Sequence, residues 1–82
     1  MKQESEDPDD SSSLEGRYTN YFEVGHNAFE FLIDFGQYYR DSQRAQLYIR
    51  IITAPIYAKA LLMTLGRSIE QYEQTFGTIP EG

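Results

Sequence analysis

The sequence contains no cysteine, so disulfide bonds and thiolate metal ligands are excluded. It has a single histidine, His26, which also argues against a conventional zinc site, because such sites draw most of their ligands from cysteine and histidine. The longest apolar run, residues 60–63, is far shorter than the roughly 20 residues that a transmembrane helix needs. We therefore expect a soluble protein that does not contact a membrane and has neither a structural metal nor another cofactor.

Apolar residues are scarce in the first 16 positions, where acidic residues dominate. Six acidic side chains there stand against Lys2 alone, and they account for most of the formal net charge of −6. Such a segment cannot bury enough apolar surface to offset the entropy lost on ordering. Residues 1–16 are therefore predicted to be a disordered acidic tail. The segment also lacks the apolar centre of a signal peptide, which together with the absence of cysteine favours a cytoplasmic location.

Alternating apolar and polar residues predict three strands in the next part of the chain, at residues 18–24, 29–35 and 44–52. In the second strand, Phe29, Phe31, Ile33 and Phe35 share one face. A short turn at residues 25–27 predicts an antiparallel hairpin between the first two strands. Residues 36–43 are predicted to be a polar loop before the third strand. The result is a three-stranded antiparallel meander in chain order.

The apolar period changes at Thr53-Ala54-Pro55, after which apolar residues recur at helical spacing for about six turns. Proline is tolerated at the first position of a helix, so a helix is predicted over residues 55–76. Ala54 is a poor cap, and Thr53 is expected to cap the helix instead. Gly77 is expected to end it in a left-handed conformation. One side of this helix carries an apolar row, called here the helix stripe: Ala58, Leu61, Leu65, Ile69, Tyr72 and Phe76.

Together these elements predict an α+β fold, β-β-β-α, over residues 17–79, with a short C-terminal tail at residues 80–82. The long helix is expected to pack on the phenylalanine-rich face of its own sheet and to form the core there. The predicted core on the sheet side consists of Phe22, Val24, Phe29, Phe31, Ile33, Phe35, Leu47, Ile49 and Ile51. A domain of this size buries only about 60% of its unfolded surface and is marginally stable alone.

Some apolar residues have no place in this core. They are Leu32, Tyr48 and Ile52 on the second face of the sheet, and Leu62 and Met63 outside the helix stripe. Small domains without disulfides or metals are commonly stabilised by a partner subunit. We therefore expect these five residues to form a homodimer interface, and the protein to be a non-enzymatic, self-associating interaction module.

Several segments resemble a family of small prokaryotic proteins catalogued as domain of unknown function 3467. They are NYFEVGHNAFEF at residues 20–31, DFG at 34–36, RIITAP at 50–55, AKAL at 58–61, IEQYE at 69–73 and FG at 76–77. The family often has serine before the proline, where this chain has Ala54. The resemblance covers residues 17–79. It implies a small cytoplasmic prokaryotic protein, and it brings no activity, cofactor or catalytic residue.

No residue pattern in the chain indicates catalysis. His26 has neither an orienting partner nor a nucleophile at a suitable spacing, so it is interpreted as a turn residue. Glu23, Glu30 and Asp34 share the second face of the predicted sheet, where Arg50 balances their charge, and no calcium-loop or other dedicated motif accompanies them. Nucleotide-binding loops and nucleophile elbows are also absent from the sequence.

Two other kinds of interaction remain as alternatives. A half-apolar second sheet face beside a long helix would suit a chaperone-like protein or secretion adaptor that binds extended polypeptide segments. Tyr38, Tyr39, Arg40 and Arg44 offer the aromatic and basic groups that stack on single-stranded nucleic acid. Nucleic-acid binding is the weaker alternative, because the domain has no basic stripe and the tail is acidic.

Overall fold

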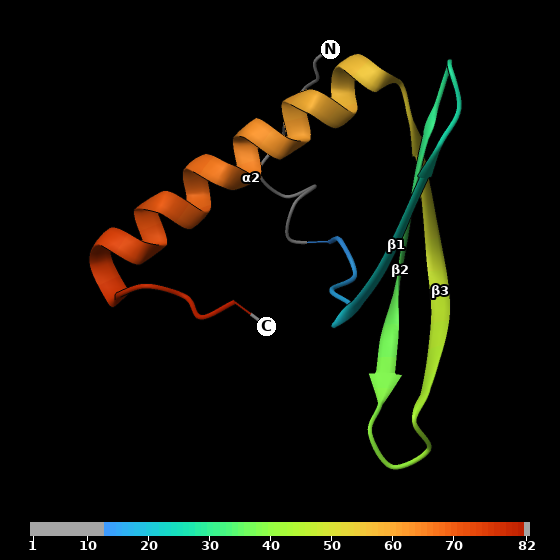
Figure 1. Ribbon diagram of the computed structural model, residues 1–82, viewed down its shortest axis with the longest axis horizontal. Helices are drawn as coiled ribbons and strands as arrows, with labels where there is room; N and C mark the ends of the chain where they lie inside the picture. The colour runs from blue at the N-terminus through green and yellow to red at the C-terminus, as the bar shows by residue number, and fades with distance from the viewer. Residues whose placement is uncertain (1–12, 82) are drawn as a thin grey trace.

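The computed structural model describes residues 13–81 and confirms the α+β class with the element order β-β-β-α. Strands β1 (Tyr21–His26), β2 (Phe31–Tyr39) and β3 (Arg44–Thr53) are followed by one helix, α2 (Pro55–Phe76) (Figure 1). The strands pair antiparallel in the order β1-β2-β3, as the meander prediction required. Residues 1–12, which make up most of the predicted acidic tail, and residue 82 lie outside the described part of the chain.

The turn between β1 and β2 lies two residues later than predicted. The side-chain oxygen of Asn27 accepts hydrogen bonds from the backbone N–H groups of Phe29 (2.7 Å) and Glu30 (2.9 Å), and the Asn27 N–H donates to the Glu30 carbonyl (3.0 Å). Asparagine favours such turns because its short side chain replaces a backbone acceptor. Gly25 and His26 therefore belong to β1, and Phe29 belongs to the turn rather than to a strand.

The loop predicted at residues 36–43 is confined to residues 40–43, and its first half is wrong, because β2 continues through Gly36 to Tyr39. The register between β2 and β3 shifts by one residue at Phe35 and Gly36, which marks a β-bulge. A Cβ atom on Gly36 would lie 2.9 Å from the Leu47 Cα and closer still to the Gln46 carbonyl. Glycine is needed at this position because β2 and β3 approach each other closely here, and it does not mark a loop. Gln43, with a φ of 55°, then completes the turn into β3.

Helix α2 has the predicted bounds, but its two caps differ from the prediction. Ala54 is the N-cap and contributes no side-chain hydrogen bond, while Thr53 is the last residue of β3. At the other end, Gly77 has the expected positive φ of 103° but an extended ψ of 167°. Its N–H donates to the Glu73 carbonyl at 3.0 Å. The chain therefore leaves α2 extended instead of in a left-handed turn.

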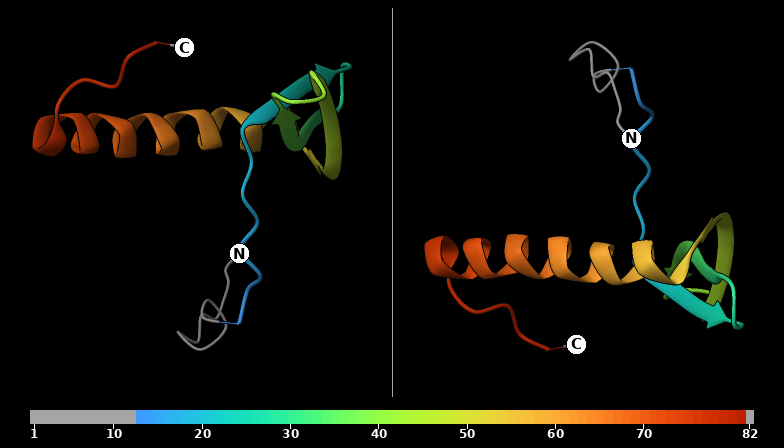
Figure 2. Two further views of the ribbon diagram at one scale, coloured as in Figure 1. Left: turned by 90° about the horizontal axis from the view of Figure 1, so that it is seen from below. Right: turned by 90° about the horizontal axis from the view of Figure 1, so that it is seen from above.

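The prediction that α2 packs on its own sheet is wrong. The helix leaves the end of β3 and runs away from the strands as a separate arm, in each of the views in Figures 1 and 2. No residue of α2 is buried, and residues 13–81 contain no buried apolar side chain. Only Ala54 separates β3 from α2, and its carbonyl already accepts the N–H groups of Tyr57 and Ala58 at 3.0 Å each. A connection this short leaves the chain little freedom to turn the helix back onto the strands.

Candidate interaction surface

Two neighbouring rows across one face of the sheet are apolar on all three strands. Strand register places Val24, Ile33 and Ile51 in one row across the three strands, and Phe22, Phe35 and Ile49 in the next. The rings of Phe22 and Phe35 meet edge to face, 5.9 Å apart, which confirms that these two side chains share a face. We call this surface the apolar face; its members are Phe22, Val24, Phe31, Ile33, Phe35, Ile49 and Ile51.

The apolar face is not covered by any part of the described chain. Phe22 remains 57% exposed and Val24 63% exposed, and even on the central strand Ile33 is only half-buried. Soluble monomers rarely expose a continuous apolar patch that spans a whole sheet. These residues were expected to form an internal core beneath the helix, and their exposure makes them candidate interaction residues that sequence reasoning had assigned elsewhere. The available signal was the connection itself, since Pro55 follows the third strand after one residue.

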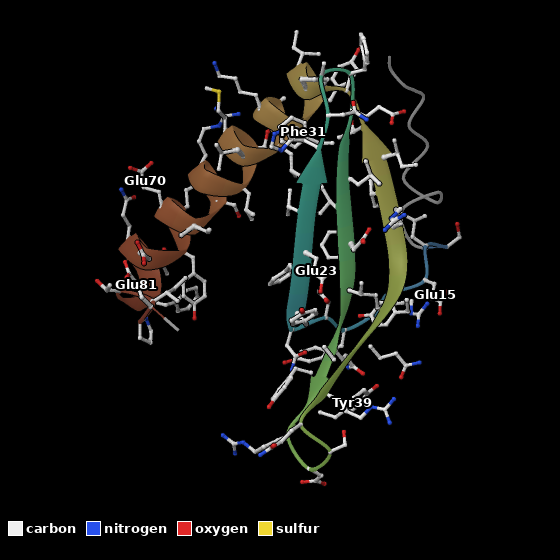
Figure 3. All side chains as sticks on the ribbon, turned by 45° about the vertical axis from the view of Figure 1, so that its right-hand side comes forward. Glu15, Glu23, Phe31, Tyr39, Glu70 and Glu81 are labelled. Carbon is white, nitrogen blue, oxygen red and sulfur yellow. The ribbon has the colours of Figure 1, made fainter. Side chains whose placement is uncertain are left out.

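The helix stripe is a second uncovered apolar surface. Leu65 remains 54% exposed, Ile69 41% and Phe76 72%, and the ring centroids of Tyr72 and Phe76 lie 4.9 Å apart. At about 100° per residue, the six members of the stripe fall within roughly 80° of the helix circumference. Three charged residues of α2 lie at least about 80° from the nearest member of the stripe: Lys59, Arg67 and Glu70. Glu73 lies about 40° from Ile69, near the edge of the stripe. Figure 3 shows Glu70 on this arm, away from the strands.

Leu62 and Met63, both predicted to lie outside the stripe, differ in position. Leu62 lies only about 20° from Ile69 around the helix and so borders the stripe. Met63 lies about 100° further on, beside Arg67 and Glu70, on the charged side of the helix. The two adjacent residues therefore cannot contact one flat partner surface equally.

The opposite face of the sheet, which we call the mixed face, combines ion pairs with apolar residues. Asp34 is 7% exposed, and it accepts hydrogen bonds from Arg50 Nε (2.8 Å) and Nη2 (2.9 Å). These bonds hold the pKa of Asp34 below its usual value, against the opposing effect of burial. Glu23 accepts a hydrogen bond from the Tyr21 hydroxyl at 2.6 Å, which raises the pKa of that tyrosine. The side chains of Asp34, Arg50 and Glu23 on this face thus already have hydrogen-bond partners within the chain.

The three sheet residues predicted for the interface lie in two places. Leu32 and Ile52 are direct partners across β2 and β3 on the mixed face. Tyr48 lies at the bulge, where its hydroxyl donates to the Tyr18 carbonyl and the Arg17 guanidinium carbon lies 4.0 Å from its ring centroid. The segment before β1 thus holds Tyr48 within the chain, whereas Ile52 stays 58% exposed.

The residues considered for chemistry are not gathered into one centre. The interpretation of His26 as a turn residue is wrong: it is the last residue of β1, where its ring stacks on that of Phe31 with 5.3 Å between the ring centroids. Within residues 13–81, no group of three or more histidine, cysteine or acidic side chains is placed to hold a metal ion. Tyr38 and Tyr39 belong to β2 and Arg44 to β3, so only Arg40 of that group lies in the turn.

Comparison with known proteins gives one match. A family model described as a protein of unknown function, DUF3467, matches residues 2–81, which confirms the resemblance inferred from the sequence motifs. No curated protein and no solved structure matches the chain significantly. In the part of the chain that the structure describes, no helix is long and apolar enough to cross a membrane.

Proposed function

Because the chain belongs to the DUF3467 family, whose description names no activity, we propose from its surfaces that it is a non-enzymatic interaction module that self-associates as a homodimer. The observation that supports this proposal is the simultaneous exposure of the apolar face and the helix stripe. Each surface is the kind that a folded protein normally buries. A second copy of the chain supplies enough apolar surface to cover both.

The location and source that accompany this proposal rest on sequence. We place the module in the cytoplasm of a prokaryotic cell, on the family resemblance and on the absence of cysteine. Fractionation of the native host with an antibody against the protein tests this placement. Recovery from the periplasm or the medium would contradict it.

The mass of the protein in solution tests self-association directly. Sedimentation velocity from nanomolar to micromolar concentration should show a dimer that dissociates on dilution, and the thermal midpoint should rise with concentration. Circular dichroism recorded on the same samples reports the helix content of each species. A well-folded species with the mass of one chain at every concentration would overturn the proposal.

The sheet edges favour one further candidate function, a chaperone-like protein or secretion adaptor that binds extended polypeptides. Each of β1 and β3 pairs only with β2, so each leaves a backbone edge beside the uncovered apolar face. Extended segments bind such edges by adding a strand, with alternate side chains reaching the apolar surface. The protein would then slow the aggregation of several unrelated unfolded clients at stoichiometric ratios. Absence of any such effect would argue against this function and leave the homodimer unaffected.

A further inference from the structure

We propose that two copies of the chain exchange their helices, so that the helix stripe of each α2 covers the apolar face of the other copy. This inference rests on the proposed homodimer and specifies which surfaces meet. It places Phe22, Val24, Ile33 and Ile51 of one copy against Leu61, Leu65 and Ile69 of its partner. The arrangement is reciprocal, as a twofold symmetric interface requires.

The geometry of the connection favours exchange over closure within one chain. Ala54 alone joins β3 to α2, and the first helical turn is fixed on its carbonyl by Tyr57 and Ala58. A helix leaving so directly keeps pointing away from its own strands, as Figure 1 shows. The stripe can therefore be covered by another copy without any change in the backbone of the connection.

The two surfaces also match in length and chemistry. Helix α2 has 22 residues and is about 33 Å long, and β3 has 10 residues and is about 33 Å long. Neither the helix stripe nor the apolar face contains a charged residue, and the charged side of α2 would stay in water. The mixed face, by contrast, would place the Asp34–Arg50 pair and Glu23 against an apolar helix. Burying those groups without new partners is costly, so the apolar face is the better fit.

Engineered cysteines can test this pairing, because the chain has no cysteine of its own. Val24→Cys places a thiol on the apolar face, and Leu65→Cys places one in the centre of the stripe. The two variants are produced with tags of different mass, mixed, allowed to exchange subunits and treated with a short bismaleimide. Glu23→Cys, the neighbouring position on the mixed face, mixed with Leu65→Cys is the matched control. Circular dichroism and sedimentation first establish that each variant keeps the wild-type helix content and mass.

Helix exchange predicts a covalent product joining the Val24→Cys chain to the Leu65→Cys chain, in several-fold higher yield than the Glu23→Cys control. Equal yields in the two mixtures would overturn it. Products that join only Leu65→Cys chains to one another would show helix-to-helix contact, which overturns the exchange and keeps the homodimer. A chain with both substitutions that cross-links internally would overturn the exchange, and sedimentation of that product at the mass of one copy would overturn the homodimer as well. If Val24→Cys alters the fold, Ile51→Cys, in the neighbouring strand of the same face, replaces it.

Discussion

Arg50 donates two hydrogen bonds to the carboxylate of Asp34 on the neighbouring strand, from Nε to Oδ1 at 2.8 Å and from Nη2 to Oδ2 at 2.9 Å. The two residues are direct register partners of β2 and β3. Two-point pairing of this kind fixes both position and orientation. Among the residues that the structure describes, Asp34 is also the one buried polar residue, with 7% of its surface exposed. The pair therefore contributes to the register of the sheet as well as to its charge balance.

The ion pair between Asp34 and Arg50 predicts that the folded chain loses stability at acidic pH. Arg50 lowers the pKa of Asp34 in the folded chain, whereas the unfolded chain has the ordinary value of about 3.9. The stabilisation is then fully present above about pH 4 and is lost as the pH falls through the lower folded pKa. We expect Asp34→Asn to lower the thermal midpoint near neutral pH and to lower it by less at pH 2–3. A constant difference between wild type and variant over this range would contradict the assignment.

Gly36 should not tolerate a side chain. A methyl group there would meet the backbone of Gln46 and Leu47, which cannot move without disturbing the bulge. We expect Gly36→Ala to lower the free energy of unfolding by about 1–3 kcal/mol in urea denaturation. Gly25→Ala is the control, because a Cβ there meets nothing within 4 Å and the φ of Gly25 is not positive. Its effect should stay within about 0.5 kcal/mol, and similar losses in both variants would refute the explanation.

Leu65 and Met63 form a matched pair for the interface. Both are 54% exposed in the single chain, so surface exposure alone predicts equal effects of substitution. Leu65 lies within the helix stripe, whereas Met63 lies on the charged side of α2. We expect Leu65→Glu to raise the dimer dissociation constant by at least about 100-fold, as for loss of a central contact, and Met63→Glu to change it by less than about 10-fold. Sedimentation equilibrium measures both constants. A larger effect for Met63→Glu would move the interface to the other side of the helix.

Asn27 should stabilise the turn between β1 and β2 through the hydrogen bonds that its side-chain oxygen accepts. Its Oδ1 receives two backbone N–H groups, from Phe29 and Glu30. We expect Asn27→Ala to destabilise the domain by about 1 kcal/mol in thermal or urea unfolding. Asn27→Asp keeps the acceptor and should retain most of the wild-type stability. If the aspartate variant is as unstable as the alanine variant, the turn does not depend on these two hydrogen bonds.

Sequence periodicity predicted the parts of the fold that are determined locally. Helix α2 begins at Pro55 and ends at Phe76 as expected, because both its apolar spacing and its flanking residues are local signals. Gly36 was misleading, since glycine marks both loops and close strand approach, and only the register with Gln46 and Leu47 distinguishes the two. The turn at Asn27 was displaced for a similar reason, because Gly25 could also have formed one.

The interaction surface was harder to predict from sequence. Periodicity identifies which side of α2 is apolar, but it carries no information on which sheet the stripe contacts. The direction in which α2 leaves the sheet follows from the backbone angles of the short connection, where Ala54 has a φ of −77° and a ψ of 156°, and periodicity does not report such angles. Residues assigned to an internal core, such as Val24 and Ile33, are for this reason candidates for contact with another chain.

The short connection at Ala54 has a consequence for the order of folding events. The three strands are joined by brief turns, so the meander can form within one chain by first-order steps. In the helix exchange proposed above, the chain would complete its core only on meeting another copy, in a second-order step whose rate depends on concentration. Newly made chains would therefore remain partly folded, with the sheet formed and its apolar face uncovered, for a time that depends on the concentration of the protein. Expression level would then govern how long the phenylalanine-rich surface stays open to misassembly with other unfolded chains.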